Sequence, residues 1–282
     1  MWVFKRVADI QTFLQKAEKQ QLKIGFVPTM GALHRGHISL IEKCKSETDL
    51  TVCSIFVNPT QFNDKKDLDK YPRTIENDLI SLENAYCDVL FLPETDDIYA
   101  DQTMKHFNLG RLEEVFEGSS RPGHFQGVCQ VVERLFDIVL PHEVFFGQKD
   151  YQQCMVINRL IDITPRFKNI QMNIVPTMRE KSGLAMSSRN TRLTGEQREQ
   201  AATIYKTLLF LKENITKDNL TIFLSDANRL LTNAGLKPDY ISIANATTLE
   251  PVNRWDGITP LVALLAAFLG EVRLIDNMTL TD

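Results

Sequence analysis

Short apolar runs alternate with segments of helical spacing over the first two-thirds of the chain. This alternation restricts the possible folds more than any other feature of the sequence. The runs are apolar along most of their length, which is typical of strands that are buried on both faces. Strands of this kind, separated by helices, indicate a parallel sheet covered on both sides. The runs are residues 23–28, 50–57, 88–93, 143–147 and 170–176.

The pattern changes after residue 176. Two helical stretches, 194–214 and 218–234, are followed by strand-like runs at 240–244, 261–269 and 271–275. We therefore predict two domains. Residues 1–176 form an α/β domain with a Rossmann-like, doubly wound parallel sheet, and residues 177–282 form a smaller α+β domain. A sheet of the first kind binds ligands at the carboxyl ends of its strands, near the point where the strand order reverses.

Composition argues against several classes of protein. The 32 basic and 36 acidic residues give a net charge of −4, whereas nucleic-acid-binding proteins usually carry a basic excess. The longest apolar run, 261–269, is far shorter than the roughly 20 residues that a membrane-spanning helix needs. The N-terminal residues lack the features of a secretory signal, so we expect a cytoplasmic protein. The five cysteines form no CxxC motif, which argues against a disulfide framework or a zinc knuckle.

The first motif with chemical content follows the first predicted strand. Residues 25–37 read GFVPTMGALHRGH, so a strand leads into a glycine-containing turn and a helix that begins near Gly36. The glycines let the backbone approach a ligand, and the N-terminus of a helix favours phosphate. The segment is neither a Walker A loop nor a dinucleotide fingerprint. His34-Arg-Gly-His37 instead has the form of the HIGH signature of class I nucleotidylyl transferases, although a metal site at the two histidines remains a weaker alternative.

A second motif follows the last predicted strand of the first domain. Met186-Ser-Ser-Arg189 offers two hydroxyl groups and a guanidinium, which suit a phosphate. Alone, such a segment is more often a capped loop than a binding site. After a HIGH-type turn, it resembles the KMSKS-type loop of the same superfamily.

Together the motifs resemble those of the pantothenate synthetase (pantoate–β-alanine ligase) family. Five segments carry the resemblance, in the order that the family has: 28–37 (PTMGALHRGH), 56–62 (FVNPTQF), 121–125 (RPGHF), 146–153 (FGQKDYQQ) and 186–190 (MSSRN). The resemblance implies that ATP and pantoate form pantoyl adenylate, which β-alanine then attacks. It also implies Mg²⁺ accompanying ATP, with no metal ligand assigned among the side chains, and a homodimer. From the charge and the apolar runs, we expect no nucleic-acid partner and no membrane.

The resemblance assigns the site residue by residue. The ATP-binding residues would be Met30, Gly31, Ala32, Leu33, His34, Arg35, Gly36, His37, Gly147, Gln148, Lys149, Asp150, Met178, Met186, Ser187, Ser188 and Arg189. Gln61 and Gln153 would bind pantoate, and Gln61, Arg121 and His124 would lie at the β-alanine end. The catalytic groups would be His34, His37, Lys149 and Arg189. Many relatives have Glu where this chain has Gln148, which leaves the side-chain role of that position open.

Other functions remain as alternatives. A related HIGH-type adenylyltransferase that acts on another small carboxylate or on a phosphorylated substrate would share the two phosphate motifs. For a phosphorylated substrate it would need a further cationic site, whereas the loop Asn58-Pro-Thr-Gln61 is uncharged. A regulatory module that binds a nucleotide or a metal without catalysis would bind ATP but release no pyrophosphate.

Overall fold

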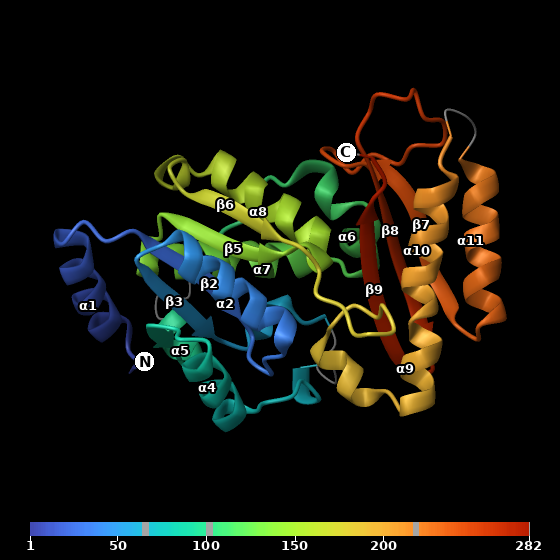
Figure 1. Cartoon of the computed structure of the whole chain (residues 1–282). Coiled ribbons are helices and arrows are strands. Elements are labelled where there is room, and N and C mark those ends of the chain that lie inside the picture. Colours follow the sequence, from blue (N-terminus) through green and yellow to red (C-terminus); the bar gives the residue numbers. More distant parts are fainter. Residues whose placement is uncertain (64–67, 100–103, 217–219, 282) are drawn as a thin grey trace. The chain divides into compact units, whose positions relative to one another are not determined.

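The computed structural model describes residues 1–63, 68–99, 104–216 and 220–281, and the chain forms two compact units (Figure 1). Unit 1 comprises Met1–Gly147 and Gln152–Val175, and unit 2 comprises Gln148–Tyr151 and Pro176–Asp282. Residues 148–151 thus group with the C-terminal part of the chain, although in the sequence they follow a strand of unit 1 and include the first residue of a helix whose other residues belong to unit 1.

Unit 1 contains a six-stranded parallel sheet with the order β1-β4-β3-β2-β5-β6. From β2 the chain proceeds outward through β3 and β4, and then returns to the other side of β2 for β5 and β6. The strand order therefore reverses between β2 and β5, where sheets of this kind bind ligands. The strands are β1 (Trp2–Phe4), β2 (Ile24–Thr29), β3 (Leu50–Ile55), β4 (Val89–Phe91), β5 (Glu143–Gly147) and β6 (Gln171–Val175).

Helices cover both faces of this sheet, and successive strand residues enter two different cores. In β2, Phe26 packs in the core with α1, α7 and α8, whereas Val27 packs in the core with α2. Val52 and Cys53 of β3 divide in the same way, as the two-residue period of a strand requires. The longer helices are α1 (Val7–Lys19), α2 (Arg35–Glu47), α4 (Ile75–Asn84), α7 (His124–Val139) and α8 (Tyr151–Ile163); α5 (Thr95–Ile98) and α6 (Phe116–Ser120) are short.

Unit 2 contains a three-stranded antiparallel sheet with the order β7-β8-β9. Its strands are β7 (Lys237–Asn245), β8 (Leu261–Leu269) and β9 (Val272–Thr279), and its helices are α9 (Gly195–Ala201), α10 (Thr203–Asn214) and α11 (Thr221–Asn233). Residues of α10 and α11 share one core with alternate residues of β8, among them Ala263 and Leu265. The predicted fold class, a parallel α/β sheet with a smaller α+β unit, is confirmed.

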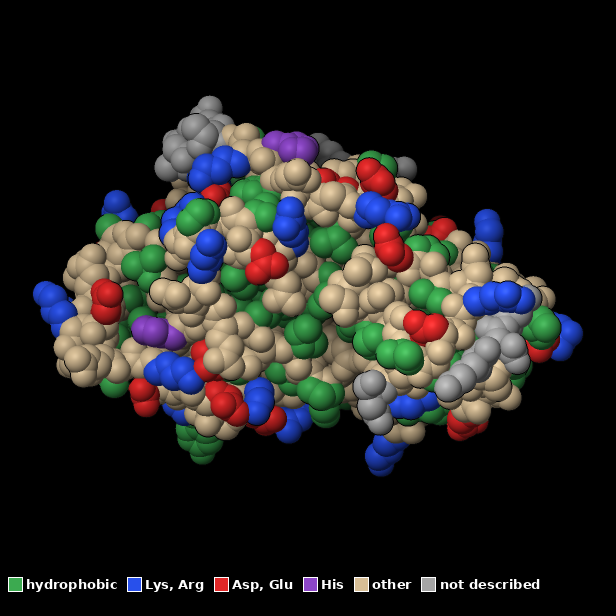
Figure 2. All heavy atoms as spheres, turned by 90° about the horizontal axis from the view of Figure 1, so that it is seen from above, with side chains coloured by type: hydrophobic (Ala, Val, Ile, Leu, Met, Phe, Trp, Pro, Cys, Tyr) green, Lys and Arg blue, Asp and Glu red, His purple; other side chains and the backbone are tan. Residues whose placement is uncertain are grey.

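The surface and the cysteines agree with the composition. On the face seen in Figure 2, basic and acidic side chains are interspersed, in keeping with the small net charge. Among the described residues, no helix combines the length and the apolar character that crossing a membrane requires. All five cysteines are buried thiols. Burial raises the pKa of the Cys87 thiol to about 12, so this group stays protonated at neutral pH.

Candidate active site

The turn after β2 has a strained backbone that a buried carboxylate holds in place. Gly31 and Ala32 both have positive φ, at 77° and 49°. Asp78 of α4, which is 2 % exposed, accepts the N–H of Ala32 at 2.9 Å and that of Leu33 at 2.7 Å. Position 31 requires glycine, because a Cβ there would lie 3.0 Å from both an Asp78 oxygen and Ile55. Asp78 therefore fixes the path of the chain into α2.

The histidine pair begins α2, and its hydrogen bonds fix the tautomers. His34 is the N-cap, and its Nδ1 accepts the N–H of Gly36 at 3.1 Å. Nδ1 of His37 accepts the N–H of His34 at 3.3 Å, and the two ring centroids are 4.1 Å apart. Since each Nδ1 is an acceptor, each neutral ring carries its proton on Nε2. Two N–H donors thus lie at the positive end of a 13-residue helix, an arrangement that suits phosphate oxygens.

We expect that Asp78→Ala lowers the free energy of unfolding by about 2–4 kcal/mol, because two shielded N–H groups lose their acceptor. Chemical denaturation followed by circular dichroism measures this change. Glu83→Ala is the matched control, because it removes an exposed carboxylate near the other end of α4. A variant of Asp78 as stable as the control would mean that the turn holds its shape without the carboxylate.

The proposed pantoate residues have different surroundings. Gln61 ends a short 3₁₀ turn (Pro59–Gln61) and is 8 % exposed. Its side-chain oxygen accepts from Asn58 at 3.2 Å, and its Nε2 lies 3.0 Å from the sulfur of Met30. The family resemblance assigns Met30 to ATP and Gln61 to pantoate, and these two residues are therefore in contact. Gln153 is half-buried near the start of α8, and its side chain has no hydrogen bond to any other part of the described chain.

Gln152, the neighbour of Gln153, has a structural role instead. Its buried side chain accepts the N–H of Glu117 at 3.0 Å and donates to the carbonyls of Leu112 and Val115. Every polar group of this amide is therefore used on the backbone of the segment before α7. Of the two adjacent glutamines, Gln153 is the one whose amide a substrate can use.

The residues assigned to the β-alanine end lie together. Nδ1 of His124 is 2.7 Å from the main-chain oxygen of Gln61, and its Nε2 is 3.3 Å from a guanidinium nitrogen of Arg121. A carbonyl only accepts, so Nδ1 carries the hydrogen and Nε2 faces the guanidinium with its lone pair. The imidazole thus links Arg121 to the 3₁₀ turn that carries Gln61.

Most of the remaining assigned residues belong to unit 2, whereas Arg35 and Gly147 belong to unit 1. Gln148–Asp150 form a 3₁₀ turn in which Lys149 has a side chain 19 % exposed, with its Nζ 3.8 Å from Asp150. The N–H of Met186 donates to the carbonyl of Met178 at 2.9 Å, which joins two assigned positions. Ser187 caps the turn Ser188–Arg192 by accepting the N–H of Arg189 at 3.2 Å. The structure thus places Met178 beside the loop that begins at Met186.

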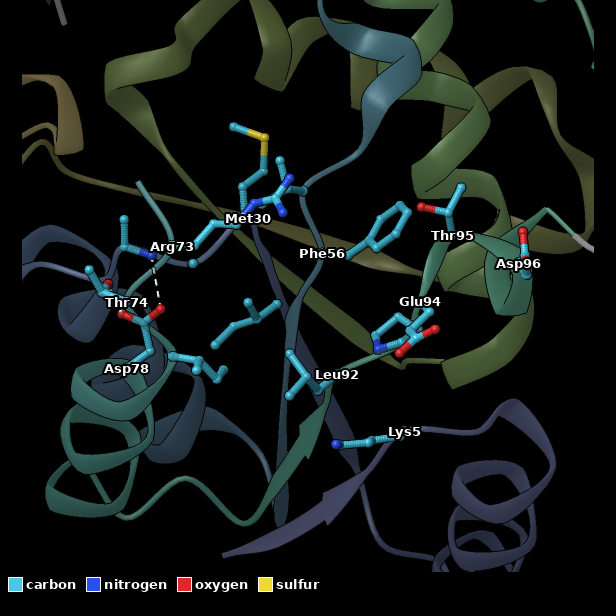
Figure 3. A pocket seen from close by; sticks show the side chains of 16 residues that line it. Lys5, Met30, Phe56, Arg73, Thr74, Asp78, Leu92, Glu94, Thr95 and Asp96 are labelled. Carbon is cyan, nitrogen blue, oxygen red and sulfur yellow. Dashed lines mark hydrogen bonds between the residues drawn. The ribbon is translucent and has the colours of Figure 1, made fainter. Parts of the chain in front are cut away.

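A hollow of about 570 Å³ opens at the carboxyl ends of β2, β3 and β4 (Figure 3). Met30, Phe56 and Leu92 line it from the three strand ends, and Arg73 and Asp78 line it from the start of α4. No sequence motif indicates either Arg73 or Asp78. Asp78 is 46 residues from the turn that it holds, so no local pattern connects the two.

Comparisons with known proteins agree with one another. The pantoate–β-alanine ligase family model matches residues 2–279. The pantothenate synthetase of Azobacteroides pseudotrichonymphae is 43 % identical over 99 % of this chain and 100 % of its own length, and that of Bacteroides fragilis is 41 % identical over 99 % and 98 %.

Two solved structures are similar over nearly the whole chain. The pantothenate synthetase from Thermus thermophilus has a TM-score of 0.87 at 36 % identity and covers 100 % of both chains. The pantoate–β-alanine ligase from Francisella tularensis, complexed with β-γ ATP and β-alanine, has a TM-score of 0.83 at 38 % identity and covers 99 % of this chain and 98 % of its own. From its sequence and its fold, the chain belongs to the pantoate–β-alanine ligase family.

Proposed function

We propose that the protein condenses (R)-pantoate with β-alanine in two ATP-dependent steps. In the first, a carboxylate oxygen of pantoate bonds to the α-phosphorus of ATP, and the bond from that phosphorus to pyrophosphate breaks. In the second, the amine nitrogen of β-alanine bonds to the acyl carbon of pantoyl adenylate. AMP leaves, the amine gives up one proton, and pantothenate is the product.

The observation that carries this proposal is the contact between the HIGH-type turn and an uncharged amide. Met30 lies in that turn, and Gln61 touches its sulfur at 3.0 Å. The Nε2–H groups of His34 and His37, at the start of α2, suit phosphate oxygens. The Gln61 amide can form hydrogen bonds with the carboxylate or the hydroxyls of pantoate without adding charge to the site. ATP and a hydroxy acid would therefore bind next to each other.

The first step needs charge neutralisation and alignment more than it needs a base. The carboxylate of pantoate is ionised at neutral pH, because carboxyl pKa values lie near 4. Attack on phosphorus then depends on positioning and on stabilising the charge of the phosphates. From the family resemblance, we assign this role to His34, His37, Lys149 and Arg189, with Ser187 and Ser188 as hydroxyl donors.

The segments assigned to ATP are suited to a magnesium ion that the nucleotide brings with it. Asp150 is the one carboxylate among the assigned residues, and its side chain is 49 % exposed. A single carboxylate together with phosphate oxygens is a usual environment for Mg²⁺, which seldom has a cage made only of protein. When bound, the ion neutralises phosphate charge, and Asp150 is the side chain that we propose to face it.

Exchange of labelled pyrophosphate into ATP tests the proposed order of steps. Exchange should require pantoate and Mg²⁺ but not β-alanine, because only the first step releases pyrophosphate. Equal exchange without pantoate, or exchange only after β-alanine is added, would falsify the two-step order. A panel of small hydroxy acids and phosphorylated compounds in the same assay separates pantoate from the substrates of related adenylyltransferases. ATP binding with no exchange for any carboxylate would indicate a regulatory module.

Gln61→Ala should weaken the binding of pantoate by roughly 1–3 kcal/mol and leave the affinity for ATP nearly unchanged, because the lost amide faces the hydroxy acid. Calorimetric titration with pantoate, at saturating non-hydrolysable ATP analogue, measures the change. Gln171→Ala removes an exposed amide at the start of β6 and serves as the control. If pantoate binds both variants equally well, Gln61 does not belong to the pantoate site.

The family resemblance also supports a homodimer in the cytoplasm, which we include in the proposal. Sedimentation equilibrium of the purified protein tests the first part. A mass near twice that of one 32.2 kDa chain is expected at micromolar concentration. Fractionation of the native cells tests the second part.

A further inference from the structure

Strand β9 contacts both of the segments of unit 2 that we assign to ATP. It lies against the 3₁₀ turn Gln148–Asp150 and against the turn Ser188–Arg192. Two adjacent buried polar residues on this strand, Asp276 and Asn277, are 3 % and 2 % exposed. Polar side chains that are this deeply buried need hydrogen-bond partners. The partners of Asp276 and Asn277 lie in, or next to, the segments assigned to ATP.

The amide of Asn277 holds the turn that carries Lys149. Its Nδ2 donates to the carbonyl of Gln148 at 2.8 Å and to that of Lys149 at 2.9 Å. Both partners are carbonyls, which only accept, so the side chain must present its NH₂ group. An aspartate of the same shape would place an oxygen against two carbonyls and would repel them.

Asp276 anchors the second segment. Its carboxylate receives two hydrogen bonds from Arg179, at 2.5 and 3.1 Å, and the N–H of Asn277 at 2.8 Å. Arg179 also donates to the carbonyl of Gly183 at 3.2 Å and lies over the Tyr205 ring at 4.3 Å. A backbone bridge joins Arg179 to the residue before Met186. The buried ion pair therefore holds the stem of the loop that contains Met186–Arg189.

We infer that Asn277 is a positioning residue for adenylate formation: through the carbonyls of Gln148 and Lys149 it aims the Lys149 ammonium, while Asp276 holds the neighbouring loop to the same strand. The inference rests on the proposed role of Lys149 in binding the phosphates of ATP. Burial raises the pKa of Asp276, and the neighbouring Arg179 and, to a smaller extent, the Lys149 ammonium oppose that rise.

A double-mutant cycle between Asn277→Asp and Lys149→Ala tests the inference. Alone, Asn277→Asp should weaken the binding of a non-hydrolysable ATP analogue by about tenfold and raise the KM for ATP in the exchange assay, with the KM for pantoate unchanged. In the Lys149→Ala background its effect should shrink to about twofold or less, because the group that it positions is gone. Asp239→Asn, which removes an ion pair to Arg273 of the same strand, is the control and should leave both constants unchanged.

Several outcomes overturn the inference, and they separate it from the proposed function. If Lys149→Ala binds ATP like the wild type, the role of Lys149 in the proposed function fails, and the inference fails with it. If Lys149→Ala is impaired but Asn277→Asp has the same effect in both backgrounds, only the inference fails. Asn277→Ala repeats the cycle if the aspartate variant does not fold, and an unfolded Asn277→Ala would mean that the amide serves stability alone.

Discussion

Replacing His37 by asparagine is expected to slow adenylate formation by about 100-fold or more while the protein keeps its fold, a typical loss when one donor to the transition state is removed. The reason lies in how the ring is held. Nδ1 accepts the N–H of His34, so the hydrogen of the neutral ring is on Nε2, where it can donate to a phosphate oxygen. The Oδ1 of asparagine can replace Nδ1 in the cap, but no asparagine atom reaches the place of Nε2.

His37→Gln is the matched variant, because its Nε2 can replace the lost donor while the cap is lost. We expect His37→Gln to keep more activity than His37→Asn and to be the less stable of the two. Rapid-quench measurement of pantoyl adenylate and thermal unfolding, made on the same samples, separate the two effects. The opposite result, with activity that follows stability, would make His37 a residue of the helix cap alone. Lys149→Ala should show a comparable loss of rate, since it removes a cation from the same phosphates.

The sequence predicts the sheet well because each central strand is buried on both faces. Residues such as Phe26 and Val27 enter separate cores, so the strand is apolar along most of its length and is easy to recognise. Strand β1 is not buried in this way and is not predicted from the sequence. Its apolar run, Trp2–Phe4, is only three residues long, and Trp2 is 65 % exposed, so the run is too short to identify a buried strand. The pairing of β1 with β4 is visible only in the folded chain.

The parts of the site that lie in continuous sequence motifs can be predicted from the sequence. The parts that depend on contacts between distant residues cannot. The HIGH-type turn and the Met186–Arg189 loop are continuous motifs. Asp78 holds the HIGH-type turn from 46 residues away, and Asn277 holds the turn Gln148–Asp150 from 129 residues away. Nothing beside either residue in the sequence indicates its target. Gln152 and Gln153 are identical in type and adjacent, so only burial and hydrogen bonding distinguish the structural amide from the available one.

The structure also bears on the second step, in which β-alanine must react as a free amine. His124 is the nearest imidazole to Gln61, but both of its nitrogens have partners, namely the carbonyl of Gln61 and the guanidinium of Arg121. A lone pair that faces a guanidinium is poorly placed to take a proton from an ammonium group. His37 is assigned to phosphate in the same site. We therefore expect aminolysis to depend on amine that has lost its proton in solution.

That expectation gives the two half-reactions different pH profiles. The amine of β-alanine should titrate near 10, by analogy with lysine at about 10.4, so about one molecule in a thousand is free base at pH 7. Below its pKa the free-base fraction rises about tenfold for each unit of pH. The kcat/KM of aminolysis for β-alanine should therefore rise steeply over roughly pH 6.5 to 9, whereas adenylate formation, which uses an ionised carboxylate, should change little. Single-turnover measurements on preformed pantoyl adenylate and on ATP with pantoate follow the two steps separately.

An aminolysis rate that stays level above pH 7 would mean that the site binds the zwitterion of β-alanine and removes its proton. In that case His124→Gln should restore the steep rise of the rate with pH, because Gln has no basic nitrogen to accept the proton.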